Sequence, residues 1–213
     1  AEWTLASFPS IFSGGYSYNH KFFHPRKRHE IGEESDTLGQ LFNKKNYQTF
    51  QAGGAWRVNP EYGFSKGFDR TIYRKEMDAK EIISHFFENY YTFKDRDQFA
   101  WLNFDDFHHH LKIIPSIFTQ SKMGHDYLEK KSEKKEKSVF ANYNTEKIEN
   151  LVNEMKKIDL NLSILFNFLE NNFSDKEILV NLVTDHGHAF LDKSNNILSV
   201  ARNSIPWFIR GNE

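Results

Sequence analysis

The sequence predicts an α/β fold in which helices cover a largely parallel sheet. Stretches with helix-spaced apolar residues alternate with short apolar runs of strand length along the chain. This alternation is typical of parallel sheets, because a helix connects each strand to the next in the same direction. Two predicted strands also run directly into clusters of Asp and His. Ligands of parallel sheets collect at the carboxyl ends of strands, so these clusters are candidates for a functional site.

The elements of the first half follow from the spacing of their apolar residues. Residues 37–45 form an amphipathic helix, and residues 47–51 a short strand, followed by a turn at the glycine pair 53–54. Residues 79–90 form a second helix with four apolar residues along one side. Residues 99–104 (F-A-W-L-N-F) are predicted to form a buried strand that stops at a pair of Asp.

The second half contains the longest periodic stretch. Residues 144–171 carry apolar side chains with a 3.6-residue period, which predicts a long helix. Residues 177–183 (E-I-L-V-N-L-V) are typical of a buried strand, and residues 205–209 of a further short strand. Between the halves, residues 129–137 (E-K-K-S-E-K-K-E-K) are nearly all charged, and we expect a solvated loop or helix surface there.

Composition narrows the classes of function. The 213 residues include 28 Lys plus Arg and 29 Asp plus Glu, a net charge of −1 without the basic excess of a nucleic-acid-binding protein. The length favours one domain, and 34 aromatic residues (21 Phe, 9 Tyr, 4 Trp) can supply its core. No run approaches the roughly 18 apolar residues of a membrane span. The absence of Cys excludes disulfides, zinc-thiolate sites and thiol catalysis.

The first polar cluster is D-D-F-H-H-H at residues 105–110, after the predicted strand 99–104. Carboxylate and imidazole groups are ligands of divalent transition metals, and protonated imidazole binds oxyanions. Three consecutive His cannot all face one site, and surface His are common, so for the cluster alone an ordinary polar surface is the favoured interpretation.

The second cluster is Asp185-His186-Gly187-His188, at the end of the predicted strand 177–183. A carboxylate and an imidazole projecting together from a strand end form half of a metal site. The glycine lets the backbone turn or approach a ligand closely. This context favours a functional interpretation over a structural one.

The third candidate is the N-terminal stretch from Trp3 to Gly14 (W-T-L-A-S-F-P-S-I-F-S-G). In a purely structural interpretation, Thr4 caps a short helix that ends at Gly14, with Ile11 and Phe12 facing the core. In a functional interpretation, the Thr4 hydroxyl lies at a helix N-terminus that attracts phosphate or sulfate oxygens. A Thr hydroxyl is a poor nucleophile unless a base or a metal activates it.

Together these stretches resemble the sulfatase family of the alkaline phosphatase superfamily. The family's nucleophile segment, in its Thr/Ser form, is roughly W-T-L-P-S-H-x-S-L-F-T-G-x-Y-x-x-x-H, and residues 3–20 match it in register. Further matches follow in family order over nearly the whole chain: 36–49 (D-T-L-G-Q-L-F-N-K-K-N-Y-Q-T), 63–69 (G-F-S-K-G-F-D), 106–108 (D-F-H), 183–187 (V-T-D-H-G) and 204–209 (S-I-P-W-F-I).

The resemblance implies a three-layer α/β/α fold of the alkaline phosphatase type and a set of site residues. Thr4 takes the nucleophile position; because formylglycine is made from Cys or Ser, an unmodified Thr resembles the branch that acts on phosphoesters. Asp185 and His186 would bind a divalent cation (Mn, Mg, Ca or Zn) that also contacts Thr4. His108 would contact the substrate oxyanion or protonate the leaving group. His188 is a further candidate for contact with the substrate or with a second metal.

Three departures from the family pattern keep alternatives open. Phe8 stands where the family usually has Arg or His, Pro9 follows it within the first helical turns, and the Lys of the sulfatase G-K-W-H element is absent from residues 53–56. The alternatives are a sulfuric ester hydrolase that uses the plain hydroxyl and a catalytically inactive binding module. We expect a small-molecule, glycan or lipid ester as substrate, no nucleic-acid partner, and an extracytoplasmic or cell-envelope location.

The extent of the chain leads to a further expectation. The family places a strand with one or two acidic metal ligands before the nucleophile segment, whereas this chain begins two residues before Trp3, at Ala1 rather than at Met. Residues 1–213 are therefore expected to be a processed product or part of a larger catalytic domain. By itself this part is expected to bind metal weakly and to have little activity.

Overall fold

The computed structural model describes residues 4–22, 31–32, 36–55, 58–109, 145–187 and 204–211. The helices in these residues are α1 (Thr4–Ser13), α2 (Ser17–His20), α3 (Leu38–Lys44), α4 (Ala79–Thr92), α5 (Asp106–His109), α8 (Thr145–Asn172) and the 3-10 helix η2 (Pro60–Tyr62). The strands are β1 (Gln48–Gly53), β2 (Arg70–Tyr73), β3 (Gln98–Asn103), β4 (Leu179–Val183) and β5 (Trp207–Gly211).

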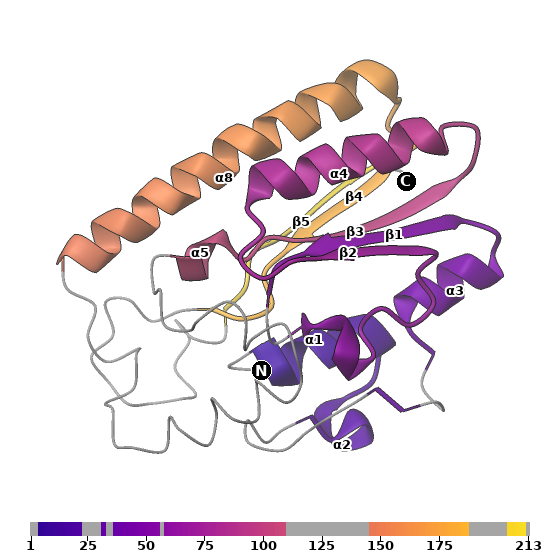
Figure 1. Cartoon of the computed structure of the whole chain (residues 1–213), viewed down its shortest axis with the longest axis horizontal. Helices are drawn as coiled ribbons and strands as arrows, with labels where there is room; N and C mark the ends of the chain where they lie inside the picture. Colours follow the sequence, from indigo (N-terminus) through magenta and orange to yellow (C-terminus); the bar gives the residue numbers. More distant parts are fainter. Residues whose placement is uncertain are drawn as a thin grey trace.

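The strands lie between two layers of helices (Figure 1). Strands β2, β1 and β3 form a parallel sheet in that order, and β4 pairs with β5 in an antiparallel ladder. Helices α4 and α8 lie on one side of the strands, and α1, α2 and α3 lie on the other (Figure 1). This arrangement confirms the predicted α/β class.

Strand β1 is the centre of the parallel sheet, and all six of its residues are buried. Its Phe50 and Ala52 pack with Ile82 of α4, on one face of the sheet. In β3, Leu102 joins the α4 and α8 side, whereas the neighbouring Trp101 packs against the cluster on the α1 side. This alternation follows from the period of two in a strand, which sends successive side chains to opposite faces.

Helix α1 is held to the sheet by aromatic rings. The ring centroids of Phe8 and Phe12 lie 5.3 Å and 4.9 Å from that of Trp101, and Phe64 lies 5.4 Å from Phe8. These distances are typical of edge-to-face aromatic pairs in a core. The helix ends at Gly14, which has a φ of +67°, as expected for a glycine after a helix C-terminus. The packing fixes where the start of α1, and with it Thr4, lies.

Polar caps set the starts of α3 and α4. The Thr37 hydroxyl accepts the N–H of Gln40, and the Gln40 side chain accepts the N–H of Thr37 in return, which is a capping box. Asp78 accepts the N–H of Glu81 at the start of α4. The buried Asp106, three positions after the last residue of β3, accepts the N–H of Ala79 at 2.9 Å. This bond ties the segment after β3 to the start of α4.

The structure differs from the sequence-based expectations in several places. Strand β1 extends to Gly53, so that glycine belongs to the strand rather than to a turn. Strand β2 was not predicted, because its four residues are too few to give a recognisable period. Strands β3 and β4 were expected to be buried, yet β3 is half-buried and two residues of β4 are exposed. The charged segment 129–137 lies outside the described residues.

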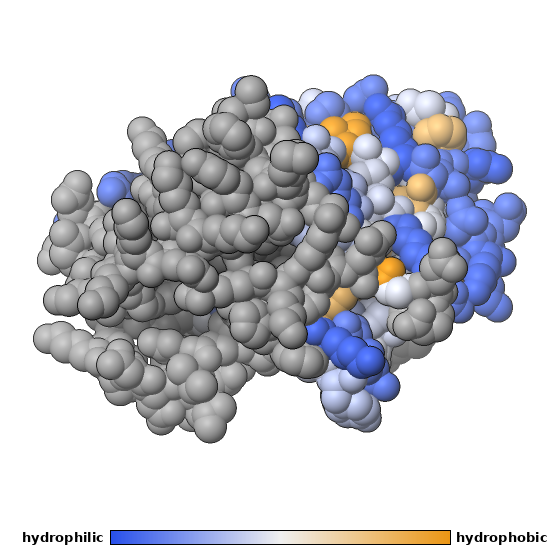
Figure 2. All heavy atoms as spheres, turned by 60° about the horizontal axis from the view of Figure 1, so that its bottom comes forward, coloured by the Kyte–Doolittle hydropathy of each residue, from blue (hydrophilic) through white to orange (hydrophobic). Residues whose placement is uncertain are grey.

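One face of the molecule is mainly polar where its residues are described. Figure 2 shows one face of the molecule, on which the described residues are mostly hydrophilic and the apolar ones are scattered. Within the ranges given above, no helix is both long enough and apolar enough to span a membrane.

Candidate active site

The carboxyl ends of β3 and β4 bring two aspartates near each other. Asp105 lies two residues after β3, and Asp185 two residues after β4. The pKa of the Asp105 carboxyl is raised to about 8. Burial is the largest cause, followed by the negative charges of Asp185 and Asp106. Like charges have such an effect only at short range in a protein interior. The two strand ends therefore form one acidic centre.

Thr4 reaches this centre from the other end of the sequence. Its Oγ1 lies 3.4 Å from Nε2 of His186, and the residues are separated by 182 positions. Thr4 is the first residue of α1, where backbone N–H groups have no intrahelical acceptor. The hydroxyl, the helix N-terminus and the strand end after β4 therefore meet at one place.

The hydrogen bonds of His186 define its tautomer. Its Nδ1 lies 2.8 Å from the carbonyl oxygen of Gly187. A carbonyl can only accept, so Nδ1 carries the proton and donates it, and Nε2 of the neutral ring keeps a lone pair. That lone pair is on the atom nearest Thr4, and the same Nε2 lies 3.6 Å from Oδ2 of Asp185. His186 thus presents a ligand or base atom to the site.

The donor set fits a divalent cation in part. A carboxylate, an imidazole lone pair and a hydroxyl are suitable ligands, and a cation would relieve the repulsion between Asp105 and Asp185. However, the described residues contain no group of three or more His, Cys, Asp or Glu side chains arranged closely enough to hold a metal. Thr4, Asp185 and His186 therefore form only a partial set of metal ligands. Two of them, Asp185 and His186, are of those side-chain types, and the third ligand is the Thr4 hydroxyl.

A buried lysine lies beside the same centre. Lys75 follows β2, is only 6% exposed, and pairs with Glu76 at 2.9 Å between Nζ and Oε1. Its positive charge lowers the pKa of Asp105, against the effects of burial and of the acidic neighbours.

A Cβ on Gly54 would lie 2.5 Å from the backbone nitrogen of Met77, so only glycine lets this segment pack on β1. Sequence reasoning missed Lys75, because the strand that it follows, β2, was not predicted. Asp105 was part of the first polar cluster, but it was given no role of its own.

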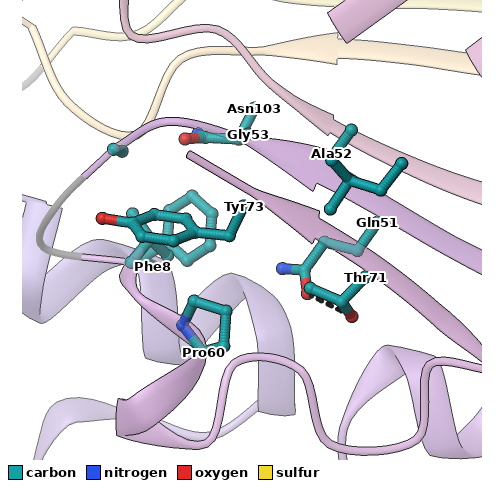
Figure 3. A pocket seen from close by; sticks show the side chains of 11 residues that line it. Phe8, Gln51, Ala52, Gly53, Pro60, Thr71, Tyr73 and Asn103 are labelled. Carbon is teal, nitrogen blue, oxygen red and sulfur yellow. Dashed lines mark hydrogen bonds between the residues drawn. The ribbon is translucent and has the colours of Figure 1, made fainter. Parts of the chain in front are cut away.

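A small pocket opens at the ends of the three parallel strands (Figure 3). It is lined by residues of α1, of the three strands and of the segment after β1: Phe8, Gln51, Ala52, Gly53, Ala55, Val58, Pro60, Thr71, Ile72, Tyr73 and Asn103. The Tyr73 hydroxyl is buried and has no hydrogen-bond partner among the described residues. Burial raises the pKa of this phenol above its ordinary value, and the charges of Asp105 and Glu61 add to the effect.

The sequence-based site residues are placed as follows. The structure brings Thr4, Asp185 and His186 together. His108 lies in α5, directly after the segment that follows β3, but its side chain is outside the described residues. His188 lies wholly outside them. Phe8, which stands at a position where Arg or His was expected, is a core residue that is 3% exposed.

Known proteins share the fold of this chain. The family model described as Sulfatase matches residues 2–212. A comparison with curated proteins by sequence gave no match. Among solved structures, one of BT4656 in complex with its substrate D-glucosamine-2-N,6-O-disulfate has a TM-score of 0.64 at 13% identity, covering 99% of this chain and 62% of that one.

Two further solved structures are similar. The C-terminal periplasmic domain of EcEptC from Escherichia coli, in complex with zinc, has a TM-score of 0.58 at 13% identity, covering 100% of this chain and 59% of the other. A protein of the alkaline phosphatase superfamily from Vibrio parahaemolyticus has a TM-score of 0.55 at 16% identity, covering 97% and 48%. The chain thus has the alkaline phosphatase-like fold and spans about half to three fifths of the length of these neighbours.

Proposed function

The chain belongs to the sulfatase family, and from this premise we propose that it is a metal-dependent hydrolase or transferase of phosphate esters with Thr4 as the nucleophile. The observation that carries the proposal is the 3.4 Å approach of the Thr4 hydroxyl to Nε2 of His186. It joins the hydroxyl at the nucleophile position of the matched N-terminal motif to the Asp-His pair of the matched C-terminal motif.

The position of Thr4 suits attack on an anionic ester. Backbone N–H groups at the start of α1 can bind oxygens of a phosphoryl group, and the helix dipole favours negative charge there. In the same complex the Thr4 Oγ1 would lie against the phosphorus. Helix α1 is fixed by its aromatic packing, so little reorganisation is needed to bring the two atoms together.

The chemical step is a displacement at phosphorus. The Thr4 hydroxyl gives up its proton to solvent, and its oxygen forms a bond to phosphorus as the bond to the alcohol oxygen breaks. The departing oxygen takes up a proton. Asp185 and His186 would hold a divalent cation, which lowers the pKa of the Thr4 hydroxyl and draws charge from the phosphoryl oxygens. His108 is proposed to protonate the leaving oxygen. Transfer of the phosphoryl group from Thr4 to water gives hydrolysis, and transfer to an alcohol gives a transferase.

The residue type at position 4 favours phosphate over sulfate. The resemblance links formylglycine to Cys or Ser at this position, and the chain has Thr there and no Cys. A sulfuric ester hydrolase would have to use the plain hydroxyl. We also propose an extracytoplasmic or cell-envelope location, in keeping with the periplasmic EcEptC domain among the structural neighbours.

The proposal is tested by the rates of Thr4→Ala and Thr4→Ser on phosphate monoesters, phosphodiesters and sulfate esters, each with Mn²⁺, Mg²⁺, Ca²⁺ or Zn²⁺. Thr4→Ala is expected to lower turnover of phosphate esters by at least about 10³-fold, as for loss of other nucleophiles, and Thr4→Ser to retain part of it. Thr92→Ala, the same change at the exposed end of α4, is the matched control. Mass spectrometry should locate a phosphoryl group on Thr4 during turnover.

Three outcomes would contradict the proposal. Unchanged rates in Thr4→Ala would show that another group is the nucleophile. Faster turnover of sulfate esters than of phosphate esters, still dependent on Thr4, would favour the sulfatase alternative. No turnover of any ester by the full-length protein would favour an inactive binding module.

A further inference from the structure

We propose that Asp106 is a positioning residue for the proposed acid, His108: its buried carboxylate fixes the start of α5, the helix that carries His108, to the start of α4. The inference rests on the proposed function, because His108 has a role only in that reaction. It is carried by one long-range hydrogen bond, by the burial of both residues that form it and by the place of α5 in the chain.

The hydrogen bond joins two buried residues. Oδ1 of Asp106 accepts the backbone N–H of Ala79 at 2.9 Å, and the exposed fractions are 4% for Asp106 and 1% for Ala79. Loss of a hydrogen bond between buried groups costs more than loss of one in water, because the N–H that stays behind is not solvated. A carboxylate is also favoured at a helix N-terminus, where N–H groups lack intrahelical acceptors. The bond is therefore a firm link between two segments.

Helix α4 has a cap of its own besides this link. Asp78 is its N-cap residue and accepts the N–H of Glu81, three residues later. Asp106 instead accepts from Ala79, which lies 27 positions earlier in the chain. The bond of Asp106 therefore fixes the position of one segment relative to another, which the bond of Asp78 does not.

Helix α4 is the fixed side of the link, and α5 is the side that is held. In the first turns of α4, Ile82 packs with Phe50 of β1, and Ile83 packs with Leu165 of α8. Helix α5 is a single turn of four residues, and so short a helix is not stable by itself. Its position depends on its neighbours, and Figure 1 shows it near the start of α4 and beside α8.

The link reaches the reaction through the backbone of α5. Asp106 is the first residue of this helix, and His108 follows two residues later in the same turn. A shift of the start of α5 therefore shifts the backbone of His108 with it. A general acid has to lie within hydrogen-bond distance of the leaving oxygen, and a misplacement of about 1 Å can cost about 10²-fold in rate. Asp106 thus acts through His108 and not on the substrate.

The dependence of the rate on the leaving group separates this role from a purely structural one. The full-length protein is assayed with Mn²⁺ on 4-nitrophenyl phosphate, whose leaving oxygen departs without a proton, and on benzyl phosphate, whose leaving oxygen needs one. Asp106→Ala is expected to lower kcat/KM for benzyl phosphate at least about tenfold more than for 4-nitrophenyl phosphate, which is part of the about 10²- to 10⁴-fold that a general acid supplies. Asp106→Asn keeps the acceptor Oδ1 and is expected to restore most of this difference.

Asp78→Ala is the matched control, because it removes the other carboxylate that accepts an N–H at the start of α4. It is expected to lower the melting temperature, as Asp106→Ala does, and to change the rates on both esters by the same factor. If Asp106→Ala does not fold, Asp106→Ser replaces it, because the shorter side chain stays polar but does not reach Ala79.

Three outcomes would overturn the inference. They are an equal loss on both esters in Asp106→Ala, the same selective loss in Asp78→Ala, and an Asp106→Asn protein as impaired as Asp106→Ala, since the charge and not the hydrogen bond would then act. In a His108→Gln protein, adding Asp106→Ala is expected to change the ratio of the two rates by less than about twofold, because the acid that it positions is absent. A further tenfold change would show that Asp106 acts through another group.

Failure of the proposed function appears separately. It would be seen as ester turnover that survives Thr4→Ala, or as a His108→Gln protein without any selective loss on benzyl phosphate. Either result removes the reaction on which the inference rests, whereas the outcomes for Asp106 above leave that reaction in place.

Discussion

Thr4 Oγ1 and His186 Nε2 lie 3.4 Å apart, and the hydrogen bond of His186 Nδ1 to the Gly187 carbonyl leaves the lone pair of Nε2 free. One residue begins the first helix, and the other follows the fourth strand. Their contact brings two residues that are far apart in sequence to one site, and it depends on the packing of α1 against the sheet.

His186 is expected to be needed for metal binding. His186→Gln removes the Nε2 lone pair that faces Thr4 and Asp185, so affinity for Mn²⁺ or Zn²⁺ should fall at least about tenfold. The measurement is calorimetric titration, together with the rise in melting temperature on adding the metal and its reversal by a chelator. His85→Gln, the same change on the outer side of α4, should bind as the unchanged protein does. Equal affinity in His186→Gln would exclude the residue from the metal site.

Asp105 is expected to make the metal-free protein less stable as the pH rises. Its pKa is about 8 in the fold and about 3.9 in an unfolded chain, so the folded state holds a proton that the unfolded state has released. The free energy of unfolding should therefore fall between about pH 4 and pH 8, by at most about 1.4 kcal/mol per pH unit. Asp105→Asn should match the unchanged protein near pH 4 and be more stable at pH 8.

Urea unfolding in the presence of a chelator at pH 4, 6 and 8 measures this effect. Asp95→Asn, an exposed aspartate in the turn before β3, is the control and should leave the pH dependence as it is. The interpretation of Asp105 would be wrong if Asp105→Asn destabilised the protein equally at every pH.

Phe8 is expected to act through stability rather than through a missing charge. It is buried among Phe12, Phe64 and Trp101, so Phe8→Leu should cost about 1 kcal/mol and Phe8→Arg more than about 4 kcal/mol. Thermal unfolding measures both, and Tyr18→Leu, at a residue that is 73% exposed, should be nearly neutral. A stable and more active Phe8→Arg protein would show that the position needs the cation found in other family members.

Gly54 is expected to be required by packing and Gly14 by backbone conformation. A Cβ on Gly54 would meet the backbone at Met77 and Arg74, whereas a Cβ on Gly14 would meet no atom within 4 Å, although its φ is +67°. Gly14→Ala should therefore cost about 1–2 kcal/mol, and Gly54→Ala more, because the Lys75 segment must move. The free energies of unfolding of the two variants measure which substitution costs more. A larger cost for Gly14→Ala than for Gly54→Ala would mean that the segment after β2 can shift with little loss of stability.

The local sequence was sufficient for the elements whose signals are long or chemically specific. The predicted helix at 37–45 is confirmed as α3 because Thr37 and Gln40 cap each other, and the long periodic stretch is confirmed as α8. Strand β2 escaped prediction because four residues give no clear period. Its last residue, Tyr73, and Lys75 shortly after it escaped with it. The expected roles of Thr4, His108, Asp185, His186 and His188 stay predictions, and only three of these side chains are among the described residues.

The sequence by itself determined the class of fold and the family, because periodicity and ordered motifs are properties of the chain, and its residue at position 4 predicts the chemical type of the nucleophile. Only the tertiary structure decided which groups act on one another. The approach of Thr4 to His186 and the effect of Asp185 on Asp105 link residues far apart in sequence. The same holds for the role of Phe8 as a core residue. Burial and distance produce these effects, and both arise only when the helices pack on the sheet.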